Sequence, residues 1–162
     1  MVSAWRLALV PGHLPVARVH GLLLDPAGRC LIQVHADRTT SLPGGVPEPR
    51  DGDLFSTLRR EAWEENQVVV TDVVHLGHQR VEHPGREPYA QVGLVGRICR
   101  FEPRRPDIDG RTYHRYLAPL ADVAALLGWG GTLTVQAAAA ARVATRLWHL
   151  PVDAPTRPAA FV

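Results

Sequence analysis

A loop rich in glycine and proline runs directly into a short acidic helix, and this junction most constrains the fold. Residues 39–50 hold two glycines and three prolines and show no apolar periodicity, which predicts a loop. In the segment 54–66, Leu54, Leu58 and Ala62 recur every four residues, as in a helix with one buried face. The loop must therefore close against a helix whose apolar row faces a core.

The second half of this helix carries three carboxylates, those of Glu61, Glu64 and Glu65. At about 100° per residue, Glu65 lies about 40° to one side of Glu61 and Glu64 about 60° to the other. Like charges at this spacing destabilise a helix, and a divalent cation would reverse that effect. Mg²⁺ prefers hard oxygen ligands, so the stripe predicts a magnesium site, although most charge runs are solvated faces. Arg60 could orient Glu64 through an ion pair.

The spacing of these residues resembles the signature of the Nudix hydrolase family. That signature is a glycine, five residues, a Glu, seven residues, then Arg-Glu, an aliphatic residue, any residue, Glu-Glu, any residue, a glycine and an aliphatic residue. Here Gly45 is followed by five residues and Asp51, then by eight residues and the run Arg60–Val68. The preceding Leu42–Gly45 is similar to the family's usual lead-in.

Two departures from the signature concern the loop and the end of the helix. Asp51 replaces the first Glu, and one extra residue precedes Arg60, which indicates an offset loop in which the shorter carboxylate is compensated. Gln67 replaces the glycine that would end the helix in the left-handed conformation. Asn66 tolerates that conformation better than most residues and could take over this role.

The resemblance implies a Mg²⁺-dependent hydrolase, with Mn²⁺ as a possible substitute. It would cleave the diphosphate linkage of a nucleoside diphosphate linked to another group, or a nucleoside triphosphate. Glu61, Glu64 and Glu65 would bind the ion, with a backbone carbonyl of the glycine pair, Gly45 in our assignment, as a further ligand. Gly44 would then lie against the substrate. The metal would neutralise charge and lower the pKa of a bound water.

The loop at 102–110 holds candidates for the rest of the site. The family draws its general base from the signature or from a later loop, and Asp107 is our preference, with Asp109 as the alternative; either could be an ordinary turn residue. Arg104 and Arg105 could steer an anionic substrate, and a solvated loop charge is about as common. The catalytic set implied by the resemblance is Arg60, Glu64, Glu65 and Asp107.

Runs of β-branched and aliphatic residues elsewhere predict strands. We expect them at 16–24, 30–35, 68–81, 89–101 and 113–117, the first two as a hairpin around Asp25–Gly28. Helices are expected at 120–127 and 134–148, the second with Thr134 as N-cap. Strands interleaved with helices predict an α/β fold, an α/β/α sandwich with a mixed β-sheet. Three prolines predict a loose tail at 151–162 after a single domain at 1–150.

Composition excludes several other classes of protein. All 18 basic residues are arginine, so Schiff-base and P-loop lysine chemistry are excluded. A net charge of +2 gives no sign of a nucleic-acid or membrane partner. Cys30 and Cys99 lack metal-like spacing, and we expect buried, reduced thiols of a cytoplasmic protein. Its partner would be a small nucleotide-like substrate, and residues 2–19 could pair or exchange in a homodimer.

A second hypothesis is a Nudix-fold nucleotide sensor or interaction module that has lost catalysis. The replacements at Asp51 and Gln67 are the kind of mild decay that such a descendant would show. All three helix carboxylates persist, however, and a protein without metal chemistry has least reason to keep them. The sequence therefore favours the enzyme.

Overall fold

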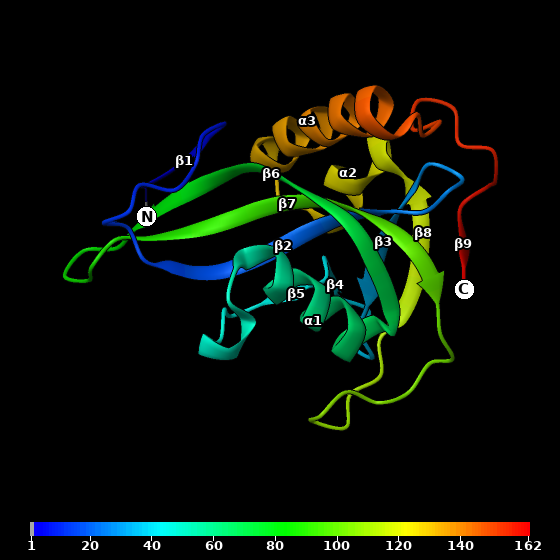
Figure 1. The fold of residues 1–162 in the computed structure, drawn as a ribbon, viewed down its shortest axis with the longest axis horizontal. Coiled ribbons are helices and arrows are strands. Elements are labelled where there is room, and N and C mark those ends of the chain that lie inside the picture. Colours follow the sequence, from blue (N-terminus) through cyan, green and yellow to red (C-terminus); the bar gives the residue numbers. More distant parts are fainter. Residues whose placement is uncertain (1) are drawn as a thin grey trace.

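The computed structural model describes residues 2–162 and contains one mixed β-sheet with helices on both faces (Figure 1). The longer strands are β2 (Val16–Leu24), β3 (Arg29–Val34), β6 (Val68–Glu82), β7 (Tyr89–Phe101) and β8 (His114–Pro119). The shorter strands are β1 (Val2–Arg6), β4 (Thr40–Ser41), β5 (Gly44–Gly45) and β9 (Ala160–Phe161). The helices are α1 (Leu54–Asn66), α2 (Val123–Leu127) and α3 (Gly131–Trp148), with 3-10 turns η1 (Pro49–Asp51) and η2 (Leu120–Asp122).

The sheet follows the order β1-β6-β7-β2-β3-β8-β9, with β4 beside β3 and β5 beside β2. Strands β2 and β7 run parallel, with Val19 next to Val92, whereas β6 and β7 form a long antiparallel pair. This combination confirms the expected mixed sheet. At its centre, β5 brings Gly44 opposite His20 of β2, and so places the glycine loop at the middle of the molecule.

Strand β2 is buried on both faces, which explains its continuous apolar run. Its side chains alternate between two cores: Leu23 packs in the core beneath α1, and Leu22 packs in the core beneath α3. Gly21 leaves the space that Leu58 of α1 fills, since a β-carbon there would lie 2.6 Å from a Leu58 methyl carbon. Figure 1 shows α1 on one side of the sheet and α3 on the other, which confirms the α/β/α sandwich.

The expected hairpin at 16–35 is only partly present. The turn at Asp25–Gly28 forms, with the Gly28 amide donating to the Asp25 carbonyl at 3.0 Å. The two strands diverge directly after this turn, so only Leu24 and Cys30 are paired. Beyond this pair, β5 lies beside β2 and β4 lies beside β3, while β7 and β8 pair with their outer edges.

Two helix boundaries test the capping predictions. Helix α2 ends at Gly128 in the left-handed conformation, as expected. Helix α3 begins at Gly131 with Gly130 as its N-cap, so the assignment of Thr134 as the cap is wrong. The φ of Gly130 is 74°, a conformation that favours glycine and that sequence patterning does not show.

The last residues are held against the sheet, and the expectation of a loose tail is wrong. Val152 is buried, and β9 adds to β8 with Phe161 opposite Tyr116. Arg29 also donates to the Pro158 carbonyl at 2.7 Å. Proline removes backbone donors from this segment, but a side chain and a two-residue strand supply the missing bonds.

Both cysteines are free, and only one of them lies where we expected. Cys30 is buried in β3, whereas Cys99 is exposed on β7, so the prediction that Cys99 is buried is wrong. Among residues 2–162, no helix has the length and apolar character needed to cross a membrane.

Candidate active site

Helix α1 has the bounds that the sequence predicts, and both of its ends are capped. The Asp53 carboxylate accepts a hydrogen bond from the Ser56 amide at 2.7 Å. Gln67 itself takes the left-handed C-cap conformation, with φ 49°, while Asn66 stays helical. The expectation that Asn66 takes over this role is therefore wrong. The Gln67 side chain offsets the strain, because it donates to the Glu64 carbonyl at 3.0 Å and accepts from the Arg105 amide at 3.0 Å.

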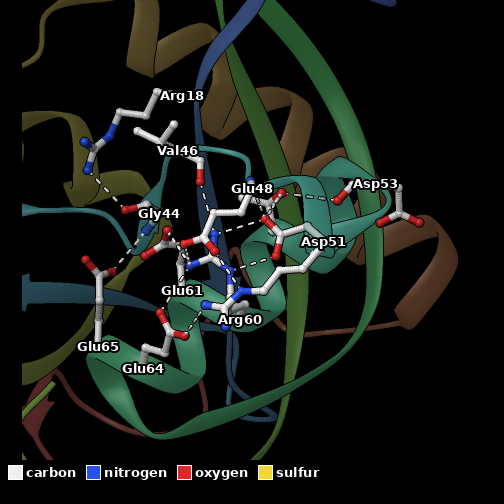
Figure 2. A network of polar contacts seen from close by, with 12 residues as sticks. Arg18, Gly44, Val46, Glu48, Asp51, Asp53, Arg60, Glu61, Glu64 and Glu65 are labelled. Carbon is white, nitrogen blue, oxygen red and sulfur yellow. Dashed lines mark hydrogen bonds and ion pairs between the residues drawn. The ribbon is translucent and has the colours of Figure 1, made fainter. Parts of the chain in front are cut away.

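The glycine pair lies against two carboxylates of α1, Gly45 against Glu61 and Gly44 against Glu65, and Figure 2 shows the second contact. A β-carbon on Gly45 would lie 2.1 Å from Glu61 Oε1, and one on Gly44 would lie 2.1 Å from the Val19 carbonyl oxygen. The Gly44 amide donates to Glu65 Oε2 at 3.2 Å. The lack of a side chain at Gly45 thus lets the loop approach α1, and the lack of one at Gly44 lets it approach β2.

Arg60 is the centre of the ion-pair network in Figure 2. It donates to both oxygens of Asp51, at 2.7 and 3.0 Å, and to Glu61 at 2.9 Å and Glu64 at 3.1 Å. This bidentate bond to Arg60 holds the pKa of the Asp51 carboxyl well below its usual range. The turn η1 absorbs the extra residue, so Asp51 reaches Arg60 in spite of its shorter side chain.

Glu65 occupies the most enclosed position of the three carboxylates. Its Oε2 accepts hydrogen bonds from Gln33 Nε2 at 2.6 Å and from the Gly44 amide. Burial nevertheless raises the pKa of Glu65 to about 7. Burial also raises the pKa of Glu61, although the nearby Arg60 charge opposes this change. Both carboxylates are therefore costly to ionise without a further positive charge.

A family model of the NUDIX domain matches residues 14–126. The chain belongs to the Nudix family. Family membership accounts for the loop and helix just described and supports the expectation of a hydrolase that acts on pyrophosphate bonds. No curated protein sequence matches the chain.

Solved structures of Nudix proteins share the fold at low sequence identity. One is a mutant of the pyrophosphohydrolase BsRppH of Bacillus subtilis, with TM-score 0.57 and 20% identity, covering 67% of this chain and 66% of that one. A NUDIX hydrolase of Nitrosomonas europaea has TM-score 0.58 and 18% identity, with coverages of 84% and 95%. The NUDIX domain of Shewanella oneidensis NrtR, complexed with ADP ribose, has TM-score 0.57 and 19% identity, with coverages of 76% and 86%.

The donor set of the Nudix helix suits a hard cation, although its side chains are not arranged around one. Within residues 2–162, no three His, Cys, Asp or Glu side chains are gathered closely enough to hold a metal ion. Arg60 lies between Glu61 and Glu64 instead. The oxygens nonetheless come from one stripe of α1 and adjoin glycines, and burial disfavours the ionised form of two of them. A divalent cation would stabilise that form, so the residues fit the ion.

In the loop after β7, Asp107 serves the structure of the loop itself, whereas Arg104 and Arg105 contact β8 and α1. Asp107 Oδ1 accepts from the Asp109 and Arg111 amides at 2.9 and 2.7 Å. Arg105 lies 4.9 Å over the Trp63 ring, and Arg104 bonds His114. In the described part of the chain, no hydrogen bond or ion pair joins these three residues to the carboxylates of α1.

Two contacts of the site were missed by sequence reasoning. Arg18 of β2 donates to the Gly44 carbonyl at 3.1 Å, and its charge acts on both Glu61 and Glu65. Gln33 of β3 donates to Glu65. The alternation of β2 could have placed Arg18 and His20 on one face, but no local pattern shows which loop that face meets. A cavity of about 400 Å³ opens beside Arg18, lined by Arg18, His20, Ser41, Leu42, Gln79, Gln91 and Trp129.

Proposed function

We propose that this Nudix protein is a Mg²⁺-dependent pyrophosphohydrolase of a nucleotide-like substrate. The substrate would be a nucleoside diphosphate linked to another group, or a nucleoside triphosphate. The observation that carries the proposal is the packing of Gly44 and Gly45 against the Glu65 and Glu61 carboxylates. A merely solvated acidic face would not need a glycine against Glu61, nor a backbone amide bonded to Glu65.

Glu61, Glu64, Glu65 and the Gly45 carbonyl would hold Mg²⁺ or Mn²⁺. When bound, the ion neutralises the diphosphate and lowers the pKa of water. Arg60 would keep Glu61 and Glu64 oriented through the bonds it already makes. Arg18 and the Gly44 backbone would face the anionic substrate, with Arg104 and Arg105 steering it from the neighbouring loop.

For the general base, the geometry favours Glu65 over Asp107. Both recorded bonds of Glu65 are made by Oε2, and within residues 2–162 none is recorded for Oε1. Gln33 and the Gly44 amide hold this carboxylate in one orientation, as a base must be held. Asp107, by contrast, is engaged by two amides of its own loop. Glu65 Oε1 would accept the proton of the attacking water.

A nucleotide-like substrate is supported by the cavity beside Arg18. Its wall offers an aromatic ring, Trp129, and amide groups, Gln79 and Gln91, next to a cation. An aromatic face and hydrogen-bonding amides suit a heterocyclic base, and the guanidinium suits the phosphates. The Shewanella oneidensis neighbour was crystallised with ADP ribose, a molecule of this type.

The test is hydrolysis of a substrate panel by the purified protein with Mg²⁺. Nucleoside triphosphates, ADP-ribose, dinucleotide polyphosphates and nucleotide sugars would be offered, and phosphorylated products measured. We expect turnover of at least one, and a loss of at least about a hundredfold in Glu65→Gln, the size expected for a general base. Glu82→Gln, on an exposed carboxylate paired with Arg80, serves as the matched control and should match wild type.

The other outcomes are equally informative. Wild-type turnover by Glu65→Gln would defeat the role given to Glu65. Saturable binding of a nucleotide without turnover across the panel would favour the nucleotide sensor. Activity that persists in excess chelator would contradict the requirement for a divalent cation.

A further inference from the structure

The Gln33 side chain is buried, and both its nitrogen and its oxygen form hydrogen bonds. It is 2% exposed and projects from β3 toward α1. Its Nε2 donates to Glu65 Oε2 at 2.6 Å and to Asn66 Oδ1 at 2.8 Å, and its Oε1 accepts from the Ser41 hydroxyl at 2.7 Å. A primary amide has two hydrogens and one carbonyl oxygen, so the three contacts engage every polar atom of the group.

Hydrogen bonds link His35, Ser41, Gln33 and Glu65 in a series, and the direction of each bond follows from the Gln33 amide. Gln33 presents Nε2 to the oxygens of Glu65 and Asn66, and so directs Oε1 to the other side. The hydroxyl of Ser41 must then donate to Gln33. The oxygen of Ser41 lies 2.7 Å from His35 Nε2, and it is left to accept from that nitrogen. Donors therefore point one way along the chain, from His35 through Ser41 and Gln33 to Glu65.

We propose that Gln33 is a positioning residue that selects which oxygen of Glu65 is available for the reaction. Together with the Gly44 amide, Gln33 fixes Oε2, and Oε1 is left to act. The amide of Gln33 cannot rotate by 180°. The reversed amide would direct its carbonyl oxygen at the Glu65 carboxylate and its NH2 group at the hydroxyl proton of Ser41, whose oxygen already accepts from His35. This role rests on the proposed function, in which Glu65 is part of the catalytic machinery.

The chain of bonds also couples parts of the fold that are distant in sequence. Gln33 lies on β3 and Ser41 on β4, paired in register, while Glu65 lies on α1. Gln33 therefore fixes the helix to the sheet at the position of the reactive carboxylate. A buried amide that served packing alone would affect the stability of the protein but not the rate of the chemical step, and this difference can be measured.

The first experiment uses the metal-free protein and needs no substrate. The two Nε2 protons of Gln33 would be assigned by NMR, and one should be shifted downfield by the Glu65 carboxylate. We expect this shift to shrink in Glu65→Gln. It should also shrink in Ser41→Val but remain in Ser41→Thr, which has the same shape and retains the hydroxyl. Gln33 protons that resemble those of an exposed glutamine, or that ignore all three changes, would overturn the proposed network.

The second experiment is a double-mutant cycle on kcat. Ser41→Val should lower kcat by about threefold to tenfold relative to Ser41→Thr, the equivalent of one hydrogen bond. In a Gln33→Met background, the two Ser41 variants should have equal kcat, because the path to Glu65 is already broken. Thermal unfolding of each variant establishes that it is folded.

Independent effects in the cycle would contradict the positioning role, as would a difference confined to stability. Absence of turnover by the wild type would instead refute the proposed function, and the NMR comparison would still decide whether Gln33 orients Glu65. Failures of the two proposals are therefore distinguishable.

Discussion

Replacing Glu65 by glutamine should stabilise the metal-free protein at alkaline pH even though it removes activity. Burial raises the pKa of Glu65 from 4.5 to about 7, so ionised Glu65 is less favourable in the folded protein than in the unfolded chain. The folded state binds more protons than the unfolded state between these values. The contribution of Glu65 to the stability of the metal-free wild type is thus fully present below about pH 4.5 and is lost as pH rises through about 7.

The size of the effect follows from the pKa difference. One pKa unit corresponds to about 1.4 kcal/mol, so ionisation of Glu65 lowers the free energy of unfolding by roughly 2 to 3 kcal/mol at pH 8. Glutamine has no charge to ionise and can still accept from Gln33. For a chain of this length, the variant should melt about 4–10 °C above the wild type at pH 8.

Urea unfolding with chelator at pH 5 and pH 8 tests this reasoning. We expect an advantage for Glu65→Gln at pH 8 that nearly vanishes at pH 5, where the wild-type carboxyl is mostly protonated. Adding Mg²⁺ at pH 8 should stabilise the wild type and reverse the order, because the ion binds only the folded carboxylate cluster. An advantage that is equal at both pH values, or a variant less stable at pH 8, would refute the argument.

Two further substitutions test the loop and the end of the helix. Gly45→Ala places a methyl group 2.1 Å from Glu61 Oε1. It should lower activity at least about a hundredfold, as expected when reacting groups are displaced by about an ångström. The control Gly12→Ala, which has no atom within 4 Å of the added methyl group, should match the wild type. Gln67→Gly relieves left-handed strain of about 1 kcal/mol but removes two side-chain hydrogen bonds of similar total value. Its urea midpoint should change little, while the amide of Arg105 exchanges faster with solvent.

The features that could be predicted from sequence are those set by local chemistry. The bounds of α1 follow from its apolar row and from the residues beside it. The approach of Gly45 to Glu61 follows from a spacing shared with the Nudix family. The strand segments were found because β-branched runs are local signals. The cytoplasmic location, the homodimer and the division at residue 150 stay predictions of the sequence.

The features that were missed depend on which distant segments meet. Strand β2 lies between β7 and β3, but it pairs with β3 only at Leu24, and the distant strands β7 and β5 supply its other partners. Gln33 looks like any polar residue on an alternating strand, and only the packing of α1 onto β3 gives it a partner. Gln67 was missed for the same reason. Its side chain compensates for the missing glycine by accepting from the amide of Arg105, which lies in a loop far along the chain.

The departure at Asp51 explains how the site is held together without a metal. Asp51, Glu61 and Glu64 all bond to the one guanidinium of Arg60, and Glu65 lies beyond its recorded contacts. Arg18 and Arg50 add two positive charges, but with Arg60 they face five carboxylates, those of Glu48, Asp51, Glu61, Glu64 and Glu65, so an excess of negative charge persists at the site. Arg60 thus keeps the helix from being destabilised by its own carboxylates, and the uncompensated charge provides the attraction for a divalent ion. Because Asp51 holds Arg60 from the side away from Glu65, a cation could bind beside Glu65 without displacing that arginine.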